Sequence, residues 1–390
     1  MTVRIFKYLA ICLFAFGLCP TSASLSAEFD KVRLFWPPPP NAPRMEYGGL
    51  FESEDHFHKP WHALVNQTQH DPSENIEKLN YPAGVAALED GTLLVAEALG
   101  KTVKKLDFNG KRVKDFFEVG SPFGELSDIA LDSDKNVYVV DREKATVHVF
   151  DLEMKPLFRL EGEIPFGRPE KVAINPKSRI AYVSDSLLNR VLAFNSEGRF
   201  LFSFGNGDND QAHLFEPHGI SINTRGDLYV ADTGNARIQV YDSAGYFLET
   251  FPFGRTPDAY TLVKPWDLAF DSQGNLHILD QELAAFITCR SDGRILYATG
   301  ASGRTNHLLG FNHPVDILVD TTDRILVTDE QNKRISTWQL FTDEYLEEKP
   351  IGNEDIHNLL AFQDHLRNQQ SRERFTTVDI RAKRNELKSS

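Results

Sequence analysis

The fold is decided by the stretch PHGISIN (residues 217–223) and the three segments after it, GDLYVAD (226–232), ARIQVYD (236–242) and YFLETF (246–251). Each segment is short and rich in β-branched and aromatic residues, which favour strands. The residues between the segments include Asn, Thr, Ser and Gly, which are typical of tight turns. The stretch therefore predicts four antiparallel strands in a row, with no helix between them.

The same pattern recurs six times along the chain. Its most regular mark is the acid that ends each second strand, namely Glu97, Asp141, Asp185, Asp232, Asp280 and Asp329, spaced 44, 44, 47, 48 and 49 residues apart. The first strand of each repeat opens with Pro82, Leu126, Pro169, Pro217, Pro265 or Pro314. A unit of this size cannot bury its own face and must stack on its copies. The sequence therefore predicts an all-β fold, a six-bladed β-propeller with four strands in each blade.

The sixth repeat is incomplete. After Leu340 the chain turns to the polar residues 342–348, so no fourth strand follows. The segment RMEYGGLFE at 44–52 has strand character and belongs to no other repeat. An unpaired sheet edge promotes aggregation. We therefore expect the N-terminal strand at about 44–52 to close the last blade.

The chain divides into four parts. Residues 1–27 have the basic start, apolar core and small residues of a signal peptide, and residues 28–43 form a Pro-rich lead-in. Residues 44–345 form the propeller, with its repeats at 81–345, and residues 346–390 form a charged C-terminal helix and tail. The protein is therefore expected to be exported, either periplasmic or extracellular, without a transmembrane anchor. A lipid on Cys19 would make it a lipoprotein attached peripherally to a membrane, although Leu18 breaks the usual pattern.

The net charge argues against nucleic-acid binding, and the cysteine content argues against an intrachain disulfide. The formal net charge is −14, and it becomes −16 once Arg4 and Lys7 are removed with residues 1–27. Nucleic-acid binding depends on neutralising phosphates, so we expect no nucleic-acid partner. Cys289 is the only cysteine outside residues 1–27, so an intrachain disulfide is not expected after cleavage.

The turn after the fourth acid resembles the NHL repeat. The resemblance is carried by DTGNARI at 232–238 after PHGI at 217–220, and more loosely by LNRV at 188–191 and NKRI at 332–335. It covers about residues 81–340 and points to propellers of the bacterial exported type. The family includes lyases, substrate-recognition domains of ligases, RNA binders and exported proteins without an assigned activity. The resemblance therefore implies a fold more than a function.

Three of the repeats carry an arginine five residues after the acid: Arg190, Arg237 and Arg334. The fifth repeat has Ala285 at this position. An acid–arginine pair at a strand end favours a structural brace of the turn between the second and third strands. We expect these pairs to do no chemistry.

Candidate binding residues follow the strand-opening prolines, where the chain reaches the mouth of the axial channel. The six residues at this position are Ala83, Ser127, Glu170, His218, Trp266 and Val315. An acid, an imidazole and an indole follow in three successive blades, so Glu170, His218 and Trp266 are the predicted ligand-binding residues. The alternative is that Trp266 plugs the channel and His218 bonds a backbone carbonyl. No residue is assigned as catalytic or as a metal ligand.

Two classes of function follow. The preferred one is a non-catalytic exported propeller that binds or scaffolds a protein, peptide or glycan partner. The alternative is a divalent-metal-dependent lyase or hydrolase that acts in the axial channel. The resemblance implies three histidines after such prolines in amidating-lyase-like propellers, and only His218 matches. Lactonase-like propellers use carboxylates and amides around a divalent cation, a set that Glu170, Asp128, Asp267 and Asp316 could imitate. We expect no cofactor, with a divalent cation as the open alternative.

Overall fold

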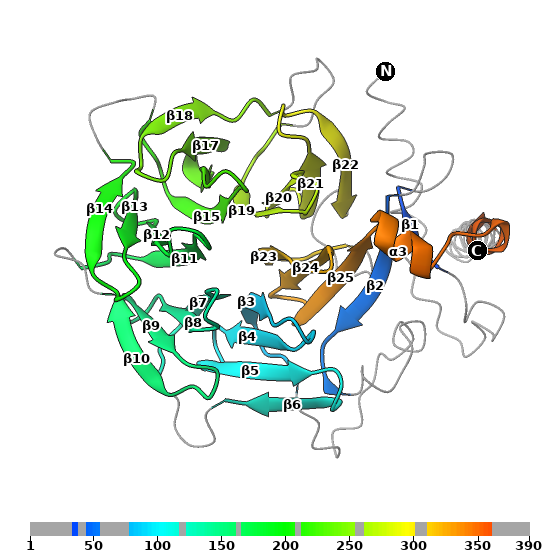
Figure 1. Cartoon of the computed structure of the whole chain (residues 1–390), viewed down its shortest axis with the longest axis horizontal. Coiled ribbons are helices and arrows are strands. Elements are labelled where there is room, and N and C mark those ends of the chain that lie inside the picture. Colours follow the sequence, from blue (N-terminus) through cyan, green and yellow to red (C-terminus); the bar gives the residue numbers. More distant parts are fainter. Residues whose placement is uncertain are drawn as a thin grey trace, which may run out of the picture.

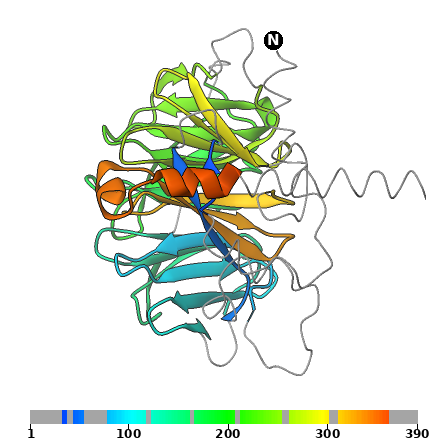
Figure 2. The same ribbon diagram turned by 90° about the vertical axis from the view of Figure 1, so that its right-hand side faces the viewer.

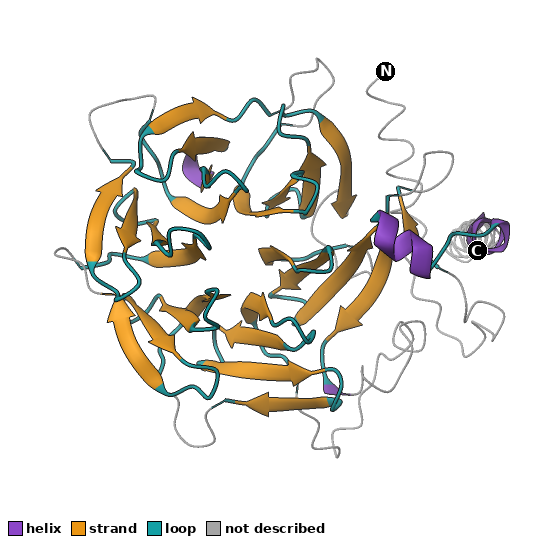
Figure 3. Ribbon diagram, in the orientation of Figure 1, coloured by secondary structure: helices purple, strands orange, loops and turns teal. Residues whose placement is uncertain are grey.

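The protein is described by a computed structural model that covers residues 33–37, 44–54, 78–116, 122–160, 165–206, 212–253, 261–300 and 310–360. The described chain is mostly strand, with short helical segments near its C-terminal end (Figure 3). No helix in this part of the chain is long and apolar enough to cross a membrane. The predicted signal peptide and the end of the predicted tail lie outside the described residues and stay predictions.

The strands form six antiparallel sheets arranged in a ring, and the first strand of each repeat lies nearest the centre (Figure 1). Blade one comprises β3 (Pro82–Ala87), β4 (Leu93–Glu97), β5 (Thr102–Asp107) and β6 (Arg112–Asp115). Blade two comprises β7 (Leu126–Leu131), β8 (Val137–Asp141), β9 (Thr146–Phe150) and β10 (Pro156–Leu160). Blade three comprises β11 (Pro169–Ile174), β12 (Ala181–Asp185), β13 (Arg190–Phe194) and β14 (Phe200–Phe204).

Blade four comprises β15 (Pro217–Ile222), β16 (Leu228–Asp232), β17 (Arg237–Tyr241) and β18 (Phe247–Thr250). Blade five comprises β19 (Pro265–Phe270), β20 (Leu276–Asp280), β21 (Ala285–Cys289) and β22 (Ile295–Gly300). Blade six begins with β23 (Pro314–Val319), β24 (Arg324–Asp329) and β25 (Arg334–Leu340). The predicted six-bladed propeller is confirmed.

The hydrophobic core lies between neighbouring blades. One cluster packs Leu94 and Ala96 of blade one against Val137 and Val139 of blade two. Comparable clusters fill the other contacts around the ring. The second strand of each blade is buried along nearly all of its length, which explains why most residues before the terminal acid are apolar.

The last blade is closed by β2 (Met45–Phe51), which pairs antiparallel with β25. The register places Met45 opposite Leu340 and Phe51 opposite Ile335. Both β2 side chains are buried, because alternate residues of β2 face the neighbouring blades. The prediction that an N-terminal strand closes the last blade is confirmed.

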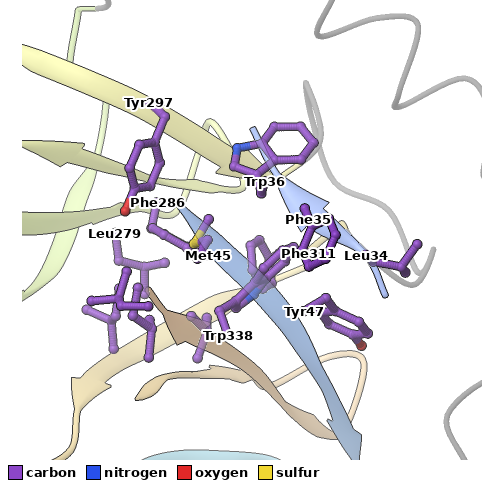
Figure 4. Close-up of a cluster of buried hydrophobic side chains, with 14 of the residues drawn as sticks. Leu34, Phe35, Trp36, Met45, Tyr47, Leu279, Phe286, Tyr297, Phe311 and Trp338 are labelled. Atoms are coloured by element: carbon purple, nitrogen blue, oxygen red, sulfur yellow. The ribbon is translucent and has the colours of Figure 1, made fainter. Parts of the chain in front are cut away.

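A fifth strand, β1 (Phe35–Trp36), pairs with the outer side of β2. Sequence analysis places these residues in the Pro-rich lead-in, because two residues are too few to show a strand period. The Trp36 indole Nε1 donates a hydrogen bond to the Ala298 carbonyl of blade five at 2.9 Å. Figure 4 shows Phe35 and Trp36 in the same cluster as Met45 and Trp338. The described part of the lead-in is therefore built into the core.

The C-terminal segment lies against this closing blade. Helix α3 (Asp343–Glu348) begins after Thr342, whose side chain accepts the Tyr345 N–H, and residues 353–360 are also helical. The Tyr345 hydroxyl of α3 donates a hydrogen bond to Glu46 Oε2 of β2 at 2.9 Å, and Figure 2 shows the red-orange helical residues 353–360 in front of the blue strands β1 and β2. Arg33 joins β2 to the C-terminal segment. Its Nη2 lies 2.7 Å from Glu46 Oε2, and its Nη1 lies 3.4 Å from Asp355 Oδ2. The predicted short C-terminal helix is confirmed.

Candidate functional site

The six repeat acids hold the loops that enter their own blades. In each blade a carboxylate oxygen accepts the backbone N–H found 17 residues earlier: Asn80 to Glu97 (2.6 Å), Gly124 to Asp141 (2.7 Å), Arg168 to Asp185 (2.9 Å), Phe215 to Asp232 (2.7 Å), Val263 to Asp280 (2.8 Å) and Asn312 to Asp329 (3.0 Å). All six acids are buried. Buried carboxylates must be hydrogen-bonded, so these acids are explained as structural parts of the repeat.

The arginines after three of these acids extend the same brace. Arg237 Nε donates to Asp232 Oδ2 at 2.6 Å, whereas the closest distances are 3.4 Å from Arg334 to Asp329 and 4.0 Å from Arg190 to Asp185. Nη2 of each arginine also donates to a carbonyl of the incoming loop, at His213, Gly310 and Pro165 respectively. The geometry favours the structural interpretation of these pairs.

A cavity of about 260 Å³ lies at the end of the ring marked by the repeat acids. All six residues that follow the first residue of an innermost strand line it, together with Glu125, Arg142, Arg168, Lys171, Gly219, His313 and Glu330. Every blade therefore contributes to one cavity wall. The fold brings Glu170, His218 and Trp266 together, as expected from the repeat positions, while their role in binding a ligand stays a prediction.

Glu170 of β11 is held by three donors. Its Oε1 accepts from Ser186 Oγ at 2.8 Å and lies 3.0 Å from Arg168 Nε, and its Oε2 accepts from Arg142 Nη1 at 3.1 Å. Arg142 also pairs with Glu125 on the same wall. Burial raises the pKa of the Glu170 carboxyl, against the opposing effects of Arg142 and Ser186. The paired charges make this part of the wall rigid and close to neutral.

His218 of β15 presents one ring nitrogen to the cavity. Its Nδ1 lies 2.9 Å from the Glu216 carbonyl oxygen, which only accepts, so Nδ1 carries the hydrogen and Nε2 is the acceptor. Burial lowers the pKa of His218 to about 4, so the ring is neutral at neutral pH. Nε2 lies 3.8 Å from Glu170 Oε1, too far for a direct hydrogen bond. A bound hydroxyl or amide N–H could donate to either atom.

Trp266 of β19 packs on His218. The two ring centroids are 3.8 Å apart with an interplanar angle of 35°, and the Lys264 ammonium lies 4.6 Å from the indole centroid. Trp266 is half-buried. His218 therefore makes the carbonyl bond of the alternative interpretation while its ring still forms part of the cavity wall.

Below these residues, Lys171 of β11 reaches across the ring to carboxylates of three other blades. Its Nζ lies 3.0 Å from Asp128 Oδ1 of β7 and 3.0 Å from Asp267 Oδ2 of β19, and it also contacts Asp316 Oδ1 of β23. The three aspartates are buried and the lysine nearly so. We name these four residues the axial cluster.

The aspartates of the axial cluster also join successive blades. Oδ2 of Asp128 accepts from Val172 N at 2.9 Å, that of Asp267 from Ile317 N at 2.9 Å, and that of Asp316 from Val85 N at 2.7 Å. The last bond links blade six to blade one. The expectation that these acids could serve as braces therefore agrees with their geometry.

Charge coupling within the axial cluster is strong. Burial would lower the pKa of Lys171, but the three neighbouring aspartates raise it well above its usual range. Burial raises the pKa of Asp267 well above its usual range, and Asp316 adds to this, while Lys171 opposes it. The lysine therefore remains an ammonium at any ordinary pH.

The axial cluster does not fit a resident divalent cation. The Lys171 ammonium takes the point toward which the three carboxylates converge, and two positive groups cannot share it. Among the described residues, no group of three or more His, Cys, Asp or Glu side chains forms a candidate metal site. His218 has no second histidine at the equivalent position of another blade.

Lys171 is the residue of this region that sequence analysis missed. A signal for it was present, because the second residue after the strand-opening position runs Gly84, Asp128, Lys171, Gly219, Asp267 and Asp316 around the ring. One cation among three acids at equivalent positions indicates a central ion pair once the blades close. The two glycines allow close approach, since a Cβ on Gly219 would lie 2.5 Å from Asp267 Cα.

Comparison with known proteins places the chain among propellers. It is 28% identical over 145 residues to the protein brain tumor of Drosophila melanogaster, covering 37% of this chain and 13% of that protein. It is 25% identical over 293 residues to the peptidylglycine alpha-amidating monooxygenase of Rattus norvegicus, covering 70% of this chain and 28% of that protein. The chain thus spans less than a third of either relative.

Among solved structures, a streptogramin B lyase superposes with a TM-score of 0.52 at 15% identity, covering 67% of this chain and 94% of that one. This likeness concerns the fold alone. The family model of the NHL repeat matches residues 216–241, the repeat from which the fold was first inferred. The chain is therefore a six-bladed β-propeller whose fourth blade matches the NHL repeat at residues 216–241.

Proposed function

We propose that this protein is an exported, non-catalytic propeller that binds a protein, peptide or glycan partner at the cavity lined by Glu170, His218 and Trp266. The observation that carries the proposal is the composition of the cavity wall, in which the charged groups are paired and His218 Nε2 faces inward as an acceptor. A wall of this kind suits a neutral polar group, such as a hydroxyl or an amide, because an unpaired charge would lose its water without gaining a partner.

The size of the cavity supports recognition of a small part of a larger partner. Its volume of about 260 Å³ lies below the usual range for drug-sized ligands, roughly 300–1,000 Å³. One amino-acid side chain or one sugar ring would fill it. The half-buried indole of Trp266 adds an apolar surface beside the polar atoms, as is common where peptides and sugars are bound.

The alternative proposal is a divalent-metal-dependent lyase or hydrolase acting in the axial channel. The similarity to the rat amidating monooxygenase over 70% of the chain favours it. The axial lysine weighs against it, and so does the single histidine at the post-proline positions. We therefore propose that the protein needs no cofactor for binding.

The test combines ligand screening with metal analysis. Residues 28–390 are screened against neutral glycans and peptides by thermal shift, and each compound that binds is titrated into His218→Ala and Trp266→Ala. We expect both variants to fold and to bind at least tenfold more weakly, since each loses a contact worth about 1.4 kcal/mol or more. Leu157→Ala, on the exposed outer strand of blade two, is the matched control.

Two outcomes would contradict the proposal. Unchanged affinity in both variants would place binding elsewhere. A stoichiometric divalent ion in the purified protein, with cleavage of a peptidyl-hydroxyglycine or a lactone that chelator abolishes, would favour the enzyme instead.

A further inference from the structure

The axial cluster has the composition of a cation site. Asp128, Asp267 and Asp316 each place a carboxylate oxygen beside one point at the centre of the ring. Oxygen ligands gathered in this way are what hard divalent cations such as Ca²⁺ prefer. In this chain the point is taken by the ammonium of Lys171, which lies 3.0 Å from Asp128 and from Asp267.

The carboxylates are oriented without help from the lysine. Asp128 and Asp316 each use one oxygen for the lysine and the other for a backbone N–H of the next blade. Asp267 Oδ2 likewise receives the N–H of Ile317. Hydrogen bonds of this kind fix ligand oxygens before a cation arrives. Removing the ammonium should therefore leave three oriented carboxylates around an open point.

The burial of the cluster also favours a cation at its centre. Three aspartate side chains lie within the protein, and the Lys171 ammonium faces all of them. A buried carboxylate without a compensating positive charge is strongly unfavourable.

We propose that Lys171 is a built-in replacement for an axial divalent cation, so that a divalent-cation site forms at Asp128, Asp267 and Asp316 only when the lysine ammonium is removed. The Lys171 side chain then holds the inner strands of the blades together at the centre of the ring, and the fold does not depend on a metal ion. This inference concerns the axis and holds whether or not the cavity binds the partner proposed above.

Two substitutions at the same position test it. Lys171→Ala removes the ammonium and leaves room for an ion, whereas Lys171→Met removes the charge but keeps the space filled. Each full chain is stripped with EDTA and then melted with increasing calcium chloride or manganese chloride. The parent should melt at the same temperature in EDTA and in either salt. Lys171→Ala should gain roughly 5 °C at a hundredfold excess over Kd, and Lys171→Met should gain nothing.

Two further variants test whether the ion binds at the three aspartates of the axial cluster. Adding Asp316→Asn to Lys171→Ala should abolish most of the gain, because it removes one ligand charge. Lys264→Ala is the matched control, since Lys264 lies over Trp266 and bonds Gln281 outside the cluster. It should respond to the salts as the parent does.

The proposal can still be tested if Lys171→Ala fails to fold. If Lys171→Ala does not fold in EDTA, its refolding from urea is compared with and without calcium chloride, beside Lys171→Met. Recovery of Lys171→Ala alone, and only with a divalent ion, supports the proposal. Equal behaviour of the two variants overturns it, as does a parent protein whose melting temperature falls in EDTA.

Discussion

The guanidinium Nε of Arg237 lies 2.6 Å from Oδ2 of Asp232, whose side chain is completely buried. The same carboxylate receives the Phe215 N–H through Oδ1, so one acid fixes both the turn of blade four and the loop that enters it. The arginine is the more exposed partner, with 28% of its side chain accessible to solvent. This unequal burial predicts unequal effects of mutation.

Arg237→Ala should lower the free energy of unfolding by about 1 kcal/mol, because Asp232 keeps its backbone partner. Asp232→Ala should cost more, about 3 kcal/mol, because the Phe215 N–H loses its acceptor. Urea denaturation measures both values. Arg225→Ala, whose side chain is 75% exposed, is the control and should change stability by less than about 0.5 kcal/mol. Loss of ligand binding in Arg237→Ala with an unchanged urea curve would contradict the structural role.

Deleting residues 28–52 should expose the edge of β25 and cause aggregation or a lower melting temperature. A milder form of the same test is Met45→Ala, which should cost about 2–5 kcal/mol because Met45 is fully buried between blades. Calorimetry and light scattering measure the two effects, with Leu157→Ala as an exposed control. A truncated chain that melts cooperatively at the parent temperature would show that β2 does not close the ring.

Acid should destabilise the protein through His218. Its pKa is about 4 in the folded chain and about 6.5 when unfolded, so between these values only the unfolded chain binds the proton. Stability therefore falls as pH falls from 6.5 to 4, by on the order of 3 kcal/mol for this group. His218→Gln cannot titrate and should lose this part of the pH dependence. Chemical denaturation at several pH values measures the difference.

The neighbouring carboxyl does not disturb this comparison. The pKa of Glu170 is raised in the folded chain, so the folded chain binds this proton at a higher pH than the unfolded chain does, and stability rises as pH falls. This effect is opposite to that of His218, and it is the same in the parent and in His218→Gln. Parallel stability curves for the parent and His218→Gln across pH 4–6.5 would mean that His218 is not buried in the neutral form.

Cys289 should be inert in the native protein. It is fully buried in β21, and burial raises the pKa of its thiol to about 12. The thiolate is the reactive form, so a thiol reagent should label residues 28–390 only as fast as the chain unfolds. Labelling followed by mass spectrometry, with and without urea, measures this. Rapid labelling without urea would refute the buried placement.

The architecture could be predicted from the sequence because the blades repeat a strand-opening residue, proline in five of the six, and an acid at nearly constant spacing, with an arginine after the acid in three of them. The closing role of residues 44–52 followed from a missing strand, which is a matter of counting. The short strand at Phe35–Trp36 could not be predicted, because its place depends on contacts with Met45 and Ala298 that no local pattern encodes.

The candidate site was predictable in position but not in chemistry. The repeat register places Glu170, His218 and Trp266 side by side around the ring. The reach of Lys171 across the ring depends on side-chain length and on how the inner strands face one another, which only the folded ring determines.

The pairing of β2 with β25 determines when the ring can close during folding. The ribosome makes residues 45–51 early and must then add nearly all of the blades before residues 334–340 exist to receive them. Until that moment the growing chain can stack blades only as an open arc with two unsatisfied ends. Completion of the ring is thus delayed until residues 334–340 can pair with residues 45–51, and until then both open sheet edges remain exposed.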